Sequence, residues 1–106
     1  MPFFDFDQME LRDFRPGIQS AAHFGEQITL AVMSIEAGKA DSGHVHSFEQ
    51  CGVVLAGSLS LTIGEETRTL EPGQGYFVPA GVPHGWSTEK SPVKILDLSS
   101  RYPAPA

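Results

Sequence analysis

Short runs in which apolar and polar residues alternate recur along the chain. Residues 59–63 (Leu-Ser-Leu-Thr-Ile) alternate at every position, which is the period of a strand with one buried face. Residues 67–70 follow a Gly-Glu turn and can return as the partner strand of a hairpin. Further strand-like runs, separated by turn residues, cover residues 27–35, 76–79, 84–88 and 93–99. Because strands about every 8–12 residues without a long helical repeat are typical of sandwiches and barrels, we predict an all-β fold.

The length and composition agree with one β-rich domain. The chain has 106 residues, the size of a single domain, and we expect residues 1–106 to form it. Its 11 glycines and 8 prolines suit many turns better than a helical bundle. Residues 1–17 form an arm with four phenylalanines, so we expect it to pack on the barrel or on a second subunit. The proline-containing tail, residues 102–106, is expected to stay outside the sheets.

Charge and cysteine content disfavour several classes of protein. A net charge of −6 opposes binding to nucleic acid, which needs a basic surface. No apolar run approaches the roughly 18–20 residues of a membrane span, and the N-terminus lacks the basic region of a signal peptide. The single cysteine, Cys51, cannot form a disulfide within the chain. This favours a reducing compartment, and we predict a cytoplasmic location.

Three of the four histidines are spaced so that their side chains can converge. His44 and His46 point to the same face of a strand, and Gln50 joins them if that strand runs unbroken from 44 to 50. His84 would come from a later strand. Three imidazoles and one oxygen suit a divalent transition metal. Two alternatives stay open: the histidines are ordinary polar surface residues, or a bulge turns Glu49 rather than Gln50 towards the metal.

Glycines at fixed distances from these histidines complete two motifs. Residues 38–57 read G-x5-H-x-H-x3-Q-x6-G, which resembles the first motif of the cupin family, where a Glu normally stands at the position of Gln50. Within residues 73–88, the pattern G-x5-P-x-G-x2-H resembles the second cupin motif. That motif ends in Asn where this chain has Thr88. The resemblance covers residues 27–100, most of the chain.

The resemblance implies a conserved double-stranded β-helix, a small jelly-roll barrel that often forms a homodimer. It also implies one divalent transition metal (Fe, Mn, Ni, Co or Zn) held by His44, His46, Gln50 and His84. A neutral Gln in place of Glu leaves the charge of the metal uncompensated, which favours an anionic ligand and a Lewis-acid role. A cupin that has lost its metal and binds a ligand in the barrel is the alternative.

One subset of small cupins is similar in more detail. Their first motif reads H-x-H-x-x-E-Q, as residues 44–50 do. These are cupins of pectin and alginate breakdown, which ketonise unsaturated uronates with a His-His-Gln-His metal site. Their last strand carries an Asp, then an aromatic residue, then an Arg near the substrate. This chain has Asp97, lacks the aromatic residue and has Arg101 at a different spacing.

Asp97 and Arg101 are therefore the candidate catalytic residues. A carboxylate within the apolar run 93–98 is costly unless it is paired or faces a polar cavity. Enol-to-keto conversion needs one acid/base group beside the metal, which Asp97 can supply. The alternative is a strand-end acid paired with Lys94, Arg101 or solvent. Arg101 can hold a substrate carboxylate with two hydrogen bonds, or can be an ordinary surface residue.

We therefore expect a metal-dependent isomerase or tautomerase acting on a small, polar, anionic molecule such as a sugar acid, with no nucleic-acid or membrane partner. A mononuclear non-haem iron dioxygenase and a non-catalytic ligand-binding or sensing cupin are the alternatives. Phe48 and Trp86 share the parity of the histidines on their strands, so each can line either the pocket or the core. Tyr76 and Phe77 are expected in the core, and His23 outside the site.

Overall fold

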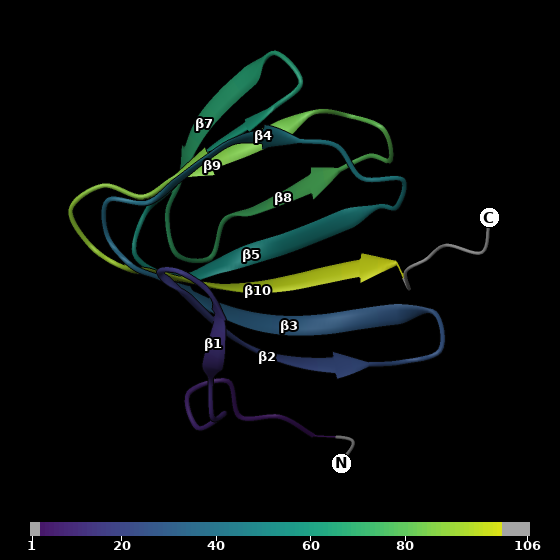
Figure 1. The fold of residues 1–106 in the computed structure, drawn as a ribbon, viewed down its shortest axis with the longest axis vertical. Helices are drawn as coiled ribbons and strands as arrows, with labels where there is room; N and C mark the ends of the chain where they lie inside the picture. The colour runs from purple at the N-terminus through teal and green to yellow at the C-terminus, as the bar shows by residue number, and fades with distance from the viewer. Residues whose placement is uncertain (1–2, 101–106) are drawn as a thin grey trace.

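The chain folds into two antiparallel sheets that face one another, in a computed structural model that describes residues 3–100 (Figure 1). The larger sheet has the strand order β1-β2-β3-β10-β5-β8 and the smaller has β4-β9-β6-β7. This jelly-roll arrangement confirms the predicted all-β barrel. The regular elements of the described range are all strands: β1 (Arg12–Arg15), β2 (Ile18–Phe24), β3 (Ile28–Ile35), β4 (Ala40–His44), β5 (Gln50–Ala56), β6 (Leu59–Ile63), β7 (Glu66–Leu70), β8 (Gly75–Val78), β9 (His84–Ser87) and β10 (Val93–Ser100).

The strands expected from alternation are confirmed. The predicted hairpin is β6 with β7, in register from Leu59 opposite Leu70 to Ile63 opposite Glu66. Strands β3, β8, β9 and β10 fall on the other predicted runs. No helix long and apolar enough to cross a membrane occurs among residues 3–100.

The N-terminal arm packs on the larger sheet. Its last part is β1, which pairs with β2. Further back, the Phe4 ring meets the ring of His23 edge-on at 5.4 Å. The Lys94 ammonium on β10 donates a hydrogen bond to the Phe6 carbonyl at 2.6 Å. Phe3 stays exposed. Arg101 and the tail 102–106 lie outside the described residues.

An unbroken strand from 44 to 50, the condition under which Gln50 would join the histidines on one face, does not occur. β4 ends at His44 in the smaller sheet, and β5 begins at Gln50 in the larger one. Residues 45–49 carry the chain between the two sheets, so they cannot stay in either ladder. Their backbone bonds elsewhere: the Gly81 N–H donates to the His46 carbonyl at 2.8 Å.

The space between the sheets is apolar at one end and polar at the other. The buried core cluster consists of Val54, Leu59, Leu61, Leu70, Val93 and Ile95. Strand β10, which lies between β3 and β5, passes from this core towards the polar end. Every second side chain of β10 faces inward, first Val93 and Ile95 and then Asp97 and Ser99. The change from apolar to polar residues on one strand therefore marks where the core ends and a cavity begins.

Candidate metal centre

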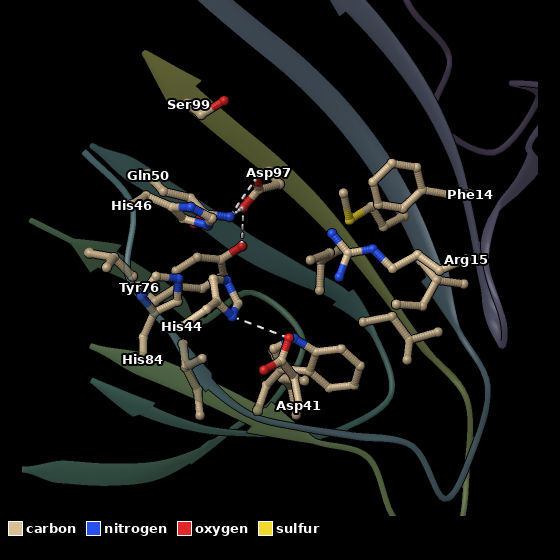
Figure 2. Close-up of a pocket in the computed structure, with 18 of the residues that line it drawn as sticks. Phe14, Arg15, Asp41, His44, His46, Gln50, Tyr76, His84, Asp97 and Ser99 are labelled. Carbon is tan, nitrogen blue, oxygen red and sulfur yellow. Dashed lines mark hydrogen bonds and ion pairs between the residues drawn. The ribbon is translucent and has the colours of Figure 1, made fainter. Parts of the chain in front are cut away.

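A cavity of about 250 Å³ opens between the sheets beyond the apolar core. It is smaller than the roughly 300–1,000 Å³ of pockets for drug-sized ligands, so it suits a small molecule. Figure 2 shows His44, His46, His84 and Gln50 gathered on one side of it, with Arg15 reaching in from the opposite side.

The three histidines that the motif predicted do converge. The ring centroid of His44 lies 4.5 Å from that of His46 and 4.3 Å from that of His84. One nitrogen from each ring can be chosen so that all three lie within 4.8 Å of one another. His44 and His84 face each other across the β4–β9 ladder, whereas His46 comes from the segment that crosses between the sheets. His46 is held there by a parallel stack on the Phe48 ring at 4.4 Å.

A bulge in β4 sets the orientation of His44. Asp41 pairs with Trp86 and His44 pairs with His84, so β4 has one residue more than β9 between these two pairs. Gly43 lies in this bulge with a φ of 137°, a conformation that favours glycine. Because of the extra residue, Asp41 and His44 both line the cavity, although they are three positions apart. The Asp41 Oδ2 then lies 3.2 Å from the His44 Nδ1.

Hydrogen bonds at Nδ1 direct the other ring nitrogens towards the cavity. The His84 Nδ1 donates to the Val82 carbonyl at 3.0 Å, which leaves its Nε2 with a free lone pair. The Nδ1 of His44 is likewise engaged by the Asp41 carboxylate, which accepts a hydrogen bond from it. Although burial opposes it, hydrogen bonds from the Gly43 N–H and from His44 hold the pKa of Asp41 below its usual value. Burial, together with the neighbouring His44 and His84, lowers the pKa of His46. Neutral imidazoles are the form that binds metals.

Asp97 holds the amide of Gln50 in one orientation. The Gln50 Nε2 donates to both carboxylate oxygens at 3.0 Å, and the Tyr76 hydroxyl donates to Oδ1 at 2.5 Å. Because the nitrogen side of the amide is bound to Asp97, the Gln50 Oε1 is left as the free acceptor. Glu49, the alternative ligand, is exposed and does not line the cavity.

Two buried acceptors lack a partner, and both belong to this cluster. Gln50 Oε1 and His84 Nε2 are the buried side-chain nitrogen and oxygen atoms of residues 3–100 without a hydrogen bond. Leaving such a group unpaired costs about 1–3 kcal/mol each. A cation between the histidines would engage both atoms. The donor set of three neutral imidazoles and one amide oxygen therefore fits a divalent transition metal.

Asp97 is buried in the cavity, at 6% exposure. Burial raises its pKa, and the hydrogen bonds from Tyr76 and Gln50 only partly offset this effect. The same burial and the adjacent carboxylate raise the pKa of Tyr76, so its phenol stays a donor. Lys94, considered above as a partner of Asp97, is bound instead to the Phe6 carbonyl, with Asp7 at 3.6 Å.

Some expectations about aromatic residues need correction. Phe77 is 54% exposed and not in the core, because it alternates with the inward-facing Tyr76 and Val78 on β8. Tyr76 does pack against the core, but its hydroxyl also reaches the site. Phe48 and Trp86 both line the cavity. His23 contacts the arm and not the site.

Sequence reasoning missed four polar groups of the site: Asp41, Arg15, Ser99 and the Tyr76 hydroxyl. Asp41 and Arg15 carry no signal in the alternation, since each faces the cavity only through a bulge in its strand. Tyr76 shares parity with the buried Val78, a signal that could have placed it towards the cavity.

The family model described as "Cupin domain" matches residues 31–99, so the chain belongs to this family. The barrel is accordingly the double-stranded β-helix of cupins. An uncharacterized protein of Streptomyces coelicolor, SCO3923, is 28% identical over 73 residues, which are 69% of this chain and 70% of that protein. H2HPP isomerase of Bacillus subtilis is 33% identical over 69 residues, 58% of this chain but only 29% of that protein.

Solved structures agree over nearly the whole chain. KdgF from a Halomonas species superposes with a TM-score of 0.86 at 24% identity, covering 98% of this chain and 96% of that one. The TT1209 protein from Thermus thermophilus gives a TM-score of 0.83 at 27% identity, covering 95% of this chain and 98% of that one. These similarities establish the fold, whereas the predicted homodimer and cytoplasmic location stay predictions.

Proposed function

We propose that this cupin is a metal-dependent isomerase or tautomerase that interconverts the enol and keto forms of a small polar anion such as a sugar acid. The observation that carries the proposal is the pair of unpartnered acceptors, Gln50 Oε1 and His84 Nε2, beside a buried carboxylate. His44, His46, Gln50 and His84 would hold the metal. When bound, the metal supplies a Lewis acid that polarises a substrate oxygen.

Asp97 is the group that moves the proton in this proposal. Its carboxylate accepts three hydrogen bonds, one from Tyr76 and two from the Gln50 amide, out of about four lone-pair sites. One site, on Oδ2, remains for the substrate. Asp97 takes the proton of the enol hydroxyl as the C=O bond forms and returns it to the carbon of the former C=C bond, where a C–H bond forms as the C=C π bond breaks. The conversion is therefore redox-neutral and needs no co-reactant.

Three further observations support this class of reaction and substrate. The related segment of the Bacillus subtilis protein belongs to an enzyme named as an isomerase. The cavity volume of about 250 Å³ suits a molecule of sugar-acid size better than a polymer. Gln50, being uncharged, leaves the metal with its full positive charge, which favours an anionic substrate.

Metal content per chain is the first test. Wild-type protein and two histidine variants, His44→Ala and His23→Ala, are measured by mass spectrometry after reconstitution with each candidate metal. We expect about one equivalent in the wild type and in His23→Ala, whose ring lies against Phe4 outside the site. His44→Ala should lose the metal. Wild-type protein without metal would refute the proposal.

Turnover of an unsaturated uronate under argon is the second test. Asp97→Asn should retain the metal while its rate falls by about 10²–10⁴-fold, the contribution of a positioned acid/base group. Metal content of the variant is measured alongside, because Asp97 also orients Gln50. Turnover that requires dioxygen, with matching oxygen uptake, would contradict the isomerase and support the iron dioxygenase.

A further inference from the structure

Arg15 enters the cavity through an irregularity in β1. Asp13 pairs with Gln19 and Arg15 pairs with Ile18, so Phe14 is an extra residue in β1, a β-bulge. In a regular strand Phe14 and Arg15 would point to opposite faces. Here both side chains line the cavity, together with Ile18 from the neighbouring strand.

The Arg15 guanidinium forms no ion pair with an acidic residue among residues 3–100, although its charge helps to lower the pKa of Asp41, which lines the same cavity. Its carbon Cζ lies over the Phe14 ring, 4.8 Å from the centroid, and no ion pair or side-chain hydrogen bond of Arg15 occurs in the described part of the chain. It is also the one lysine or arginine of that part that lines the cavity. Figure 2 shows the guanidinium facing the histidine cluster across the open space. A guanidinium that lines a cavity without an ion pair is available to bind an anionic ligand there.

We propose that Arg15, stacked on Phe14, binds the carboxylate of the substrate at the end of the cavity opposite the histidines. The inference builds on the proposed function and names the residue that recognises the negative charge. The substrates are then small organic anions in which a short carbon skeleton separates the carboxylate from the enol or keto group that reacts. Arg15 then supplies the two hydrogen bonds to a substrate carboxylate that the sequence analysis offered as a role for Arg101.

Equilibrium binding tests this role without relying on turnover. The probes are D-galacturonate, succinate and D-galactose, the last being the neutral counterpart of galacturonate. Binding to the metal-loaded protein is followed by calorimetry and by the fluorescence of Trp86, which lines the same cavity and is the chain's single tryptophan. The variants are Arg15→Met, Arg15→Lys and Arg101→Met. Arg12→Met is the matched control, because it removes the same charge from the same strand outside the cavity.

Arg15→Met should weaken binding of the two anions by at least about tenfold, the loss expected for a charge-assisted hydrogen bond, with galactose unaffected. Arg15→Lys should recover part of the affinity, and Arg12→Met should match the wild type. Thermal unfolding of each variant checks that folding is intact. The proposal is overturned if Arg15→Met binds the two anions as tightly as the wild type does. It is also overturned if the wild-type protein binds neither anion, or binds both no more tightly than galactose.

The outcomes for Arg15 and for the isomerase are separable. Arg15-dependent anion binding in a protein that turns over no uronate leaves Arg15 as the anion site and refutes the isomerase. Uronate turnover whose KM is unchanged in Arg15→Met supports the isomerase and overturns the role of Arg15. A loss of anion affinity in Arg101→Met but not in Arg15→Met also overturns it.

Discussion

The Tyr76 hydroxyl is the smallest group whose removal tests the polar network behind the metal centre. It donates to Oδ1 of Asp97, whose carboxylate in turn fixes the Gln50 amide. Tyr76→Phe removes this one donor and leaves the ring, which packs against the core, in place. The variant therefore changes hydrogen bonding to a buried carboxylate without creating a cavity larger than one oxygen atom.

The expected cost follows from the burial of Asp97. A hydrogen bond to a charged group contributes about 1.5–3 kcal/mol, and Asp97 is only 6% exposed, so water cannot replace the lost donor. Two contacts from the Gln50 amide remain. We expect Tyr76→Phe to lower the free energy of unfolding by about 2 kcal/mol. For a domain of this size that corresponds to a fall in Tm of about 8 °C.

The assay is urea unfolding of the metal-free protein at neutral pH, followed by Trp86 fluorescence. The control is Thr67→Val, which removes a hydroxyl hydrogen-bonded to Thr62 at 2.7 Å on the exposed surface. It should change the free energy of unfolding by no more than about 0.5 kcal/mol. If the free energy of unfolding of Tyr76→Phe falls by no more than that of the control, the reasoning is refuted, because the buried carboxylate would then not depend on the tyrosine.

Two further substitutions test how the site is framed. In Gly52→Ala, the added Cβ would lie 2.5 Å from both the Leu96 carbonyl and the Tyr76 hydroxyl. We therefore expect the hydrogen bond from Tyr76 to Asp97 to break and urea unfolding to show a free energy of unfolding lower by about 1–3 kcal/mol. An unchanged free energy of unfolding would contradict this packing. Thr88→Val removes a buried hydroxyl that donates to the Glu36 carbonyl at 2.6 Å and accepts from the Lys39 N–H at 3.0 Å. It should cost about 1–3 kcal/mol but leave metal content per chain at wild-type level, and loss of metal would show that Thr88 also supports the site.

The second of these substitutions bears on a departure from the family pattern. Thr88 stands where the second cupin motif normally ends in Asn, and the sequence offered no role for it. In the structure its hydroxyl bridges the turn after β3 to the end of β9. The position therefore closes the apolar end of the barrel, and its side chain does not line the cavity.

Sequence alone determined six of the ten strands, β3 and β6 to β10, because a run with one apolar face buries that face whatever the neighbouring strand is. Motif spacing also selected the four residues of the candidate metal centre. Of these, His84 does come from a later strand, as expected, and it pairs directly with His44 across the β4–β9 ladder. His46 and Gln50 reach the same cavity although the unbroken strand assumed between them does not exist.

Tertiary structure decided which other polar side chains face that cavity. The bulges at Phe14 and Gly43 turn Arg15 and His44 inward, and each bulge exists only relative to the strand paired beside it. Parity counted along one strand assumes a regular ladder, so it fails wherever one partner carries an extra residue. The free oxygen of the Gln50 amide is likewise set by Asp97, 47 positions away in the chain. Local sequence determines which residues can form strands, whereas pairing between distant strands determines where their polar groups point.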